Sequence, residues 1–415
     1  MKKWALIVGL TGILVSFSSM DCVQAEEAKP QTDYETEVQE VKKEASALEV
    51  VVKRNSKSWL PAQKLANTYM YLAKLTGDYS WYKKTESILG IAKQKAPQGS
   101  GPLQSLAGLH YTMHRIDEAE KHNQVRANSI LLSRKDRAEI ASLEGDIAFH
   151  RQDYETARTK YDQAIELNET PQSLFKKAYF FWQTGDFKNA EAWTRKADAK
   201  VADRDQYMKA WMDLQLGLMD LDRDRLDEAL AHYQEANTHF KGYWLIREHI
   251  AEIYSLQSKY DIAEKMYVEL VEETQSPELM SALAEVYENT NRPELAKKLI
   301  KNSTRIYKRR LRQYKTASLG HAFDHFLSHG RPQTVMQLAQ ENYEVRPNAE
   351  ASLMLAQAHL KLNQFKQAED VIEKLLQTPY RSPALYEVAA ETSLRNNKRT
   401  QAKNFLEKAQ ELRMN

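Results

Sequence analysis

Cysteine, glycine and proline are scarce in this sequence, and each shortage narrows the range of structures that it can form. The chain of 415 residues has 13 glycines, 11 prolines and a single cysteine, Cys22. Few helix-breaking residues, together with abundant alanine, leucine, glutamate, lysine and glutamine, favour a mostly helical chain divided into short segments. Cys22 lies inside an N-terminal segment that has the features of a removable leader. Without that segment the chain has no thiol, which excludes a disulfide, a thiolate zinc site and a cysteine nucleophile.

An excess of either charge is also absent. Lysine and arginine number 59, aspartate and glutamate number 57, and the net charge is +2. Removing the first 25 residues takes away Lys2, Lys3 and Asp21 and leaves a net charge of +1. A nearly neutral chain has no general attraction for nucleic acid or for an anionic membrane, so we expect neither as a partner. Because the charge is balanced overall, we interpret the local basic run at residues 305–315 as a solvated helix face.

Long apolar runs are missing except at the N-terminus. Lys2 and Lys3 precede an apolar run over residues 4–17, and small residues follow up to Ala25. A charged start, an apolar stretch and a small-residue cleavage site are typical of a secretory signal peptide. The run is shorter than the roughly 20 residues of a membrane-spanning helix, so we predict a signal peptide over residues 1–25 and no stable membrane insertion after its cleavage. The protein is then exported, periplasmic or secreted; the alternative is an N-terminal segment that is kept as an anchor.

What the sequence does contain is a repeat. Its most regular member is a small residue whose successive copies are 38, 33, 39, 34, 33, 39, 33 and 34 residues apart. Alanines placed by chance would not keep this interval. The residues are Ala119, Ala157, Ala190, Ala229, Ala263, Ala296, Val335, Ala368 and Ala402.

Further small and aromatic residues recur around each of these positions. The third copy shows the whole pattern, with a turn at residues 151–154 between the two predicted helices. Its members are Leu143, Gly145, Ala157, Tyr161 and Ala164. Small residues where two antiparallel helices cross let their backbones approach closely, and aromatic residues fill the space between hairpins. Since a single hairpin cannot bury its apolar face, we expect the units to stack, with contacts only between nearest neighbours.

This pattern resembles the tetratricopeptide repeat, whose period of about 34 residues and order of small and aromatic residues it shares. The resemblance covers about residues 59–412. It implies an all-α fold, a right-handed α-solenoid of about ten helix-turn-helix repeats. Other families of helical repeats have periods of about 40 residues or more, so they fit the observed spacing less well. Residues 26–58 precede the repeats, and we predict a flexible N-terminus over residues 28–33, followed by a leading helix over residues 38–52 that caps the stack.

Sequence motifs of catalysis are not found. The sequence has no glycine-rich phosphate loop, no His-Glu-x-x-His and no Gly-x-Ser-x-Gly. His321, His325 and His329 are spaced four residues apart, so they share a helix face on which imidazoles can bind a metal ion. Asp324 lies beside them in the sequence, but no cysteine or dedicated further ligand is evident, and we therefore predict no metal site, no cofactor and no enzymatic activity. The alternative is an auxiliary subunit of an enzyme complex with a metal site at this histidine cluster.

The resemblance also implies where a partner binds. In tetratricopeptide repeats the first helix of each hairpin lines a concave groove that holds a protein or peptide. Carried onto this sequence, that geometry predicts an apolar wall followed by an acidic wall, with about half of the apolar residues packed inside the stack. Together these walls suit a peptide with hydrophobic anchors and a basic end. The predicted partner-binding residues are Phe149, Phe175, Tyr179, Trp182, Trp211, Leu218, Leu221, Glu252 and Glu285, with Glu248, Glu278 and Glu288 beside the last two.

The function that these features predict is that of an exported scaffold for protein–protein interaction, such as an envelope adaptor or an assembly factor. This prediction depends on the family resemblance and on the N-terminal segment, because no catalytic motif points elsewhere.

Overall fold

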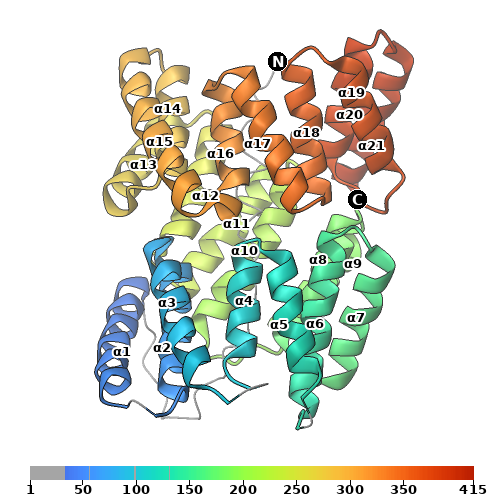
Figure 1. Ribbon diagram of the computed structural model, residues 1–415. Coiled ribbons are helices and arrows are strands. Elements are labelled where there is room, and N and C mark those ends of the chain that lie inside the picture. The colour runs from blue at the N-terminus through green and yellow to red at the C-terminus, as the bar shows by residue number, and fades with distance from the viewer. Residues whose placement is uncertain (1–32, 56, 98–99, 130) are drawn as a thin grey trace.

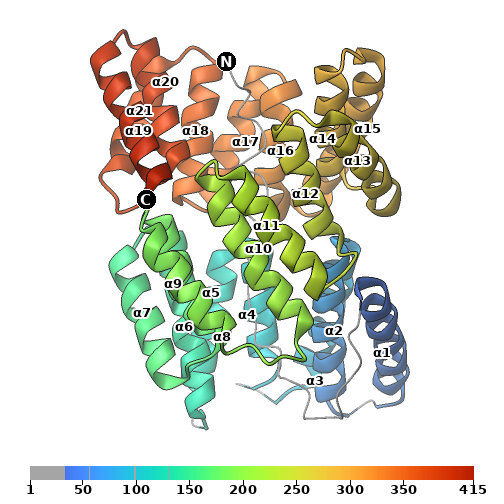
Figure 2. The same cartoon turned by 180° about the vertical axis from the view of Figure 1, so that it is seen from behind.

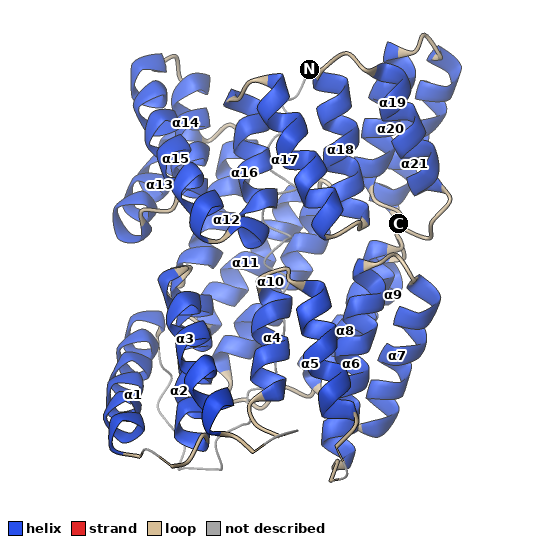
Figure 3. Cartoon of the chain, viewed as in Figure 1, coloured by secondary structure: helices blue, strands red, loops and turns tan. Residues whose placement is uncertain are grey.

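The structure is a computed structural model, and it describes residues 33–55, 57–97, 100–129 and 131–415. Within these ranges every regular element is a helix, and there are 21 of them (Figure 3). The predicted signal peptide and the predicted flexible start lie outside the described residues, apart from Asp33 at the end of the latter. The first helix, α1 (Tyr34–Arg54), contains the range predicted for the leading helix.

The other 20 helices form ten consecutive hairpins, which confirms the predicted fold of helical repeats. In chain order the hairpins are α2 (Leu60–Thr76) with α3 (Ser80–Lys95), α4 (Leu103–Thr112) with α5 (Ile116–Ala127), α6 (Arg134–His150) with α7 (Tyr154–Leu167), α8 (Pro171–Gln183) with α9 (Phe187–Asp198), α10 (Gln206–Asp222) with α11 (Leu226–His239), α12 (Trp244–Leu256) with α13 (Tyr260–Thr274), α14 (Pro277–Asn289) with α15 (Pro293–Gln313), α16 (Lys315–His329) with α17 (Pro332–Val345), α18 (Ala349–Lys361) with α19 (Phe365–Leu376), and α20 (Pro383–Arg395) with α21 (Arg399–Met414).

The turns inside the hairpins are short, and residues within each turn determine its shape. In the third unit Gln152 has a φ of 61°, and in the fourth Gly185 has a φ of 79°, so one left-handed residue reverses the chain. The next residue then caps the second helix: the Asp153 carboxylate accepts a hydrogen bond from the backbone N–H of Thr156 at 3.1 Å. The turn predicted at residues 151–154 is confirmed.

The helix crossings explain the spacing of the small residues. All nine residues of the alanine series, including Val335, are at most 1% exposed. At Gly145 an added Cβ would lie 2.7 Å from the Tyr161 ring, and at Gly217 it would lie 2.3 Å from the Tyr233 ring. A small residue on one helix therefore makes room for a side chain of its partner helix, and this contact keeps the two helices of a hairpin close together.

The solenoid coils into two tiers. Figure 1 shows α1 to α9 in the lower tier and α13 to α21 in the upper tier, and Figure 2 shows α10, α11 and α12 running between them. The tiers touch, so the expectation of contacts between nearest neighbours alone is wrong. The Trp244 indole donates a hydrogen bond to the carbonyl of Leu75 at 2.8 Å, and the Gln152 amide donates one to the carbonyl of Pro347, 195 residues further along the chain. The coil thus returns on itself after about six repeats of 34 residues.

The crossing of α10 and α11 at Gly217 can be tested by adding a methyl group there. Gly217→Ala forces a methyl group to within 2.3 Å of the ring of Tyr233, which is fully buried. We expect it to lower the free energy of unfolding by roughly 1–3 kcal/mol, the usual cost of overpacking. The measurement is urea unfolding followed by circular dichroism.

Gly90 provides the matched control. It is exposed on α3, and a Cβ added there would meet nothing within 4 Å. Gly90→Ala should therefore stabilise the protein by up to about 1 kcal/mol through helix propensity alone. Equal effects of the two substitutions would contradict the packing role of the glycine at the crossing.

Candidate functional site

The two tiers enclose one large central cavity. Its volume is about 2000 Å³, and the first helix of every hairpin, from α2 to α20, contributes residues to its lining. The groove that the family resemblance implies is therefore present. It is a chamber bounded by both tiers instead of an open concave face, because the coil returns on itself.

One side of the chamber is an aromatic wall. We use this name for the seven apolar residues predicted to face a partner, all of which line the cavity: Phe149, Phe175, Tyr179, Trp182, Trp211, Leu218 and Leu221. The wall is held by edge-to-face ring contacts, such as Phe175 against Trp211 with ring centroids 4.4 Å apart. Tyr179 and Leu218 are half-buried, whereas the other five are buried and show only part of their surface to the cavity.

The predicted acidic residues divide into two groups. Glu285 lines the cavity, as do Glu248, Glu278 and Glu288. Glu252 does not line it, which corrects the expectation for that residue. It is only 6% exposed, because its carboxylate lies 3.0 Å from Nδ1 of the buried His249 one turn earlier on α12.

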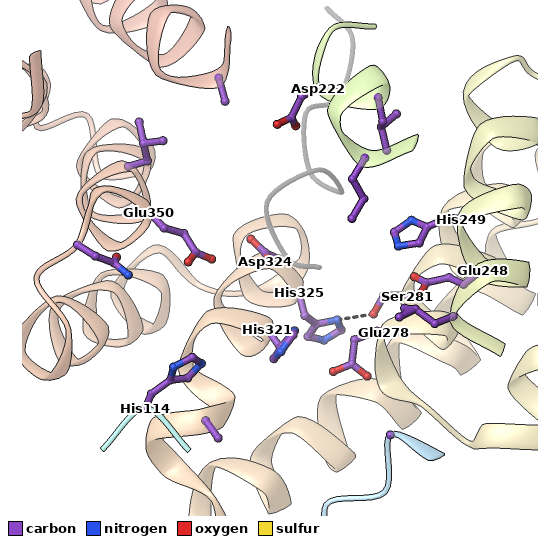
Figure 4. Close-up of a pocket in the computed structure, with 18 of the residues that line it drawn as sticks. His114, Asp222, Glu248, His249, Glu278, Ser281, His321, Asp324, His325 and Glu350 are labelled. Carbon is purple, nitrogen blue, oxygen red and sulfur yellow. Dashed lines mark hydrogen bonds between the residues drawn. The ribbon is translucent and has the colours of Figure 1, made fainter. Parts of the chain in front are cut away.

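Ten polar residues gather where the tiers meet, and Figure 4 shows them around one open space. They come from the α4–α5 turn and from the first helices α10, α12, α14, α16 and α18. We call them the polar cluster: His114, Asp222, Glu248, His249, Glu278, Ser281, His321, Asp324, His325 and Glu350.

Some carboxylates of the cluster have cationic partners. Glu278 accepts a hydrogen bond from the Arg310 guanidinium at 2.8 Å. Burial opposes the ionisation of Glu278, but the charge of Arg310 prevails and holds its pKa at about 2. Glu350 lies 3.8 Å from Arg346, a weaker ion pair.

Three carboxylates of the cluster, Asp222, Glu248 and Asp324, differ from these; we call them the inner carboxylates. Among the described residues, none of the three has a lysine or arginine within ion-pair distance. Asp222 accepts a hydrogen bond from the Trp182 indole at 2.7 Å, whereas Oε2 of Glu248 and Oδ2 of Asp324 are buried without any hydrogen-bond partner. Burial raises the pKa of Asp222 to about 6 and that of Glu248 to about 8, and it raises the pKa of Asp324 well above the ordinary value.

The three histidines on α16 do not act as one group. His325 is buried, and its two ring nitrogens lie 3.0 Å from the Ser281 hydroxyl and 2.8 Å from the Thr304 hydroxyl. His329 is exposed, and Nδ1 of His321 has no hydrogen-bond partner. Throughout the described ranges, no three histidine, cysteine or acidic side chains are arranged to hold a metal ion.

The basic run at residues 305–315 is only partly the solvated face that the sequence predicts. Arg305, Lys308 and Arg312 are exposed. Arg310 is not: it pairs with Glu278 and lies over the ring of Tyr79, 4.7 Å from its centroid. The reason is the length of α15, whose 21 residues extend from the upper tier to the lower one, so that its last turn meets Tyr79, a residue far away in sequence.

Two segments match a known protein family. Residues 142–205 and residues 349–378 each match a family model described as tetratricopeptide repeat. The first segment contains the second half of α6 together with α7, α8 and α9, and the second contains α18 and α19, so the matches lie on hairpins of the repeat. No curated protein matches the sequence.

Several solved structures are similar. A tetratricopeptide repeat protein from Parabacteroides merdae is 17% identical over 59% of this chain and 99% of its own, with a TM-score of 0.33. The human IFIT1 dimer with m7Gppp-AAAA is 13% identical over 93% of this chain and 96% of its own, with a TM-score of 0.44. The Cut9–Hcn1 hetero-tetramer of APC/C is 14% identical over 91% of both chains, with a TM-score of 0.36.

The raised pKa of Glu248 predicts how stability depends on pH. The unfolded chain ionises this group near its ordinary pKa of 4.5, whereas the folded chain retains the proton up to about pH 8. Glu248 therefore lowers the free energy of unfolding progressively as pH rises from about 5 to about 8. Glu248→Gln removes this titration, so the variant should gain up to several kcal/mol relative to the parent at pH 9 and much less at pH 5. Urea unfolding at the two pH values measures the difference.

Glu278→Gln is the matched control from the same cluster. The pKa of Glu278 is depressed, so its contribution to stability is present above its ordinary pKa and is lost only as pH falls toward 2. Removing the charge leaves Arg310 without its partner, and the variant should lose stability at both pH 5 and pH 9. Effects of the same sign in the two variants would show that the two carboxylates are not in different environments.

Proposed function

This chain is a tetratricopeptide repeat protein, and from that premise we propose that it is an exported scaffold, without catalysis of its own, that holds a peptide segment of another protein inside its central cavity. The observation that carries the proposal is the aromatic wall. Seven large apolar side chains from three hairpins line one side of the same cavity. Aromatic anchors of this kind dominate the energetics of protein interfaces.

The size of the cavity favours a peptide over a small molecule. Pockets for small molecules usually have volumes of about 300–1,000 Å³. The cavity measures about 2000 Å³ and has lining residues from both tiers. A folded domain would need the tiers to separate, whereas an extended or helical segment fits between them.

The charges of the lining favour protein over nucleic acid. The cavity lining has twelve aspartates and glutamates against eight lysines and arginines, and an acidic surface repels phosphate groups. The apolar residues of the lining offer hydrophobic contact, which suits peptide side chains.

The proposal of export depends on residues 1–25, which have the order of a signal peptide: two lysines, an apolar run and small residues up to Ala25. In the part of the chain that the structure describes, no helix combines the length and apolar character needed to cross a membrane. Outside the cytoplasm, the role we propose is that of an envelope adaptor or an assembly factor.

Export can be tested with the N-terminal segment alone. Residues 1–25 fused to a reporter that is active only outside the cytoplasm should give activity, and replacing Lys2 and Lys3 with glutamate should reduce it. N-terminal sequencing of the exported full chain should begin at Glu26. Recovery of chains that begin with Met1 in the soluble cytoplasm would contradict the proposal.

Peptide binding can be tested on the half-buried part of the aromatic wall. Tyr179→Ala with Leu218→Ala should weaken binding of a labelled peptide of leucine, tryptophan and neutral polar residues at least tenfold, because interface anchors contribute about 2 kcal/mol or more. Fluorescence anisotropy measures the affinity. The thermal melt should change little, since both side chains are half-buried.

Two control variants separate binding from folding. Tyr254→Ala removes a half-buried tyrosine that does not line the cavity, so peptide affinity should stay unchanged. Trp182→Ala removes a side chain that is only 2% exposed, and it should destabilise the fold by roughly 3–5 kcal/mol. If the unaltered protein binds no such peptide, or if the double variant binds it as well as the parent does, the proposed site is wrong.

A further inference from the structure

The inner carboxylates form a site that the aromatic wall does not explain. Glu248 is only 4% exposed, it lines the cavity, and its Oε2 atom has no hydrogen-bond partner. Oδ2 of Asp324 is buried and without a partner in the same cavity. Buried polar atoms are nearly always hydrogen-bonded, so two such orphaned atoms in one cavity point to a group that the bound state supplies.

The two arginines that act on Asp222 are each paired with another carboxylate. Arg413 pairs with Glu387, and Arg223 pairs with Asp220 at 2.6 Å and also with Glu191. Neither of these arginines is free to neutralise Asp222, although both act on it electrostatically.

Glu248 has one neighbour that can carry positive charge, His249, whose pKa is lowered by burial but raised overall by Glu252 and Glu248. Around Glu248 the charged and titratable groups are His249, Glu252 and Glu278. His249 is hydrogen-bonded to Glu252, and Glu278 is paired with Arg310.

Asp324 faces Glu350 and Arg346. The Arg346 Nε–H donates a hydrogen bond to Asn342 at 2.9 Å, and its guanidinium lies 3.8 Å from Glu350. Arg346 is therefore committed elsewhere, and Asp324 is left without a counter-ion.

The acidic and apolar surfaces are continuous. Trp182, a member of the aromatic wall, donates its indole N–H to Asp222 at 2.7 Å. On α10, Leu218 precedes Asp222 by one helical turn, so both lie on the face that lines the cavity. A ligand that fills this region must therefore present an apolar side chain and a cation close together.

We propose that the occupant of the cavity is a basic peptide segment, in which lysine or arginine side chains pair with Asp222, Glu248 and Asp324 while neighbouring apolar side chains rest on the aromatic wall. This inference depends on the proposed function, because it names the chemistry of the peptide that the scaffold holds. A charged amine or guanidinium supplies the donors that the orphaned oxygens of Glu248 and Asp324 need. A bare metal ion fits less well, since no three ligands are arranged to coordinate one among the described residues.

Binding of a basic peptide should also depend on pH. The pKa values of Asp222 and Glu248 are raised to about 6 and about 8, so part of the site carries protons at neutral pH. A cationic peptide favours the ionised carboxylates, so its binding must release protons. The preference for a basic peptide should therefore increase as pH rises from 6 to 9, a range in which lysine stays charged.

The test uses the full chain and three labelled probe peptides. The first contains two lysines among leucine and tryptophan residues; in the second the lysines are glutamines, and in the third they are glutamates. The protein variant is Asp222→Asn with Glu248→Gln and Asp324→Asn, which keeps the shapes and removes the charges. The control variant, Glu155→Gln with Glu344→Gln and Glu373→Gln, removes three exposed carboxylates from the outer helices α7, α17 and α19.

We expect the unaltered protein and the control variant to bind the lysine peptide at least tenfold more tightly than the glutamine peptide. The cavity variant should lose this preference while binding the glutamine peptide as the parent does, which also shows that it is folded. Should the triple cavity variant fail to bind the glutamine peptide, Glu248→Gln alone should reduce the preference at pH 8.

Three results overturn the inference, and they can be told apart. Equal affinity of the unaltered protein for the lysine and glutamine peptides removes the basic specificity and leaves the proposed peptide scaffold in place. A lysine preference that persists in both the triple variant and Glu248→Gln assigns the specificity to other residues. Binding of none of the three peptides by the unaltered protein contradicts the proposed function as well.

Discussion

The close crossing of two helices within each hairpin is the contact on which the rest of the structure depends. A small residue on one helix faces a large one on its partner, as Gly145 faces Tyr161 and Gly217 faces Tyr233, and the nine residues of the alanine series are buried in nine of the ten hairpins. Because the crossing fixes the angle between the helices, each hairpin stacks on the next with a similar rotation. The nine rotations between the ten hairpins coil the chain through more than one turn, and the second tier then rests on the first. The cavity between the tiers is thus a consequence of packing inside single hairpins.

Contacts between the tiers change what kind of solenoid this is. An open stack has only nearest-neighbour contacts, and its stability is close to a sum over units. Here Trp244 is hydrogen-bonded to Leu75 and lies against Gly77, where an added Cβ would be 2.9 Å from its ring. Such contacts join units that are far apart in sequence, so damage to one tier weakens the other. They also turn a groove into a chamber, which favours an extended or helical segment as the occupant over a folded domain.

The sequence predicts the structural features that depend on neighbouring residues. It does not predict contacts between distant units, because these depend on the pitch of the coil. Helices, turns and the repeat period follow from local spacing, and the family resemblance implies the inward position of Phe175 and Trp211. The predictions for Glu252 and Arg310 are wrong, because the burial of Glu252 against His249 and the pairing of Arg310 with Glu278 depend on packing that spacing alone does not reveal. The special position of Asp222 and Asp324 could not be recognised either, since any surface carboxylate on a helix has the same local pattern. Only the meeting of α10, α12 and α16 around one space distinguishes them.

The inner carboxylates are costly to the fold, and this cost is the best argument that they serve binding. A buried carboxylate without a counter-ion either keeps its proton or destabilises the folded state, and the raised pKa of Glu248 reflects the first outcome. Glutamine would fit the same space without this cost, so folding alone does not require the acid. A protein can tolerate such a loss of stability where a site needs it for function. A partner that brings its own positive charge recovers the lost interaction energy only on binding, and it gains a selectivity that an apolar chamber by itself cannot provide.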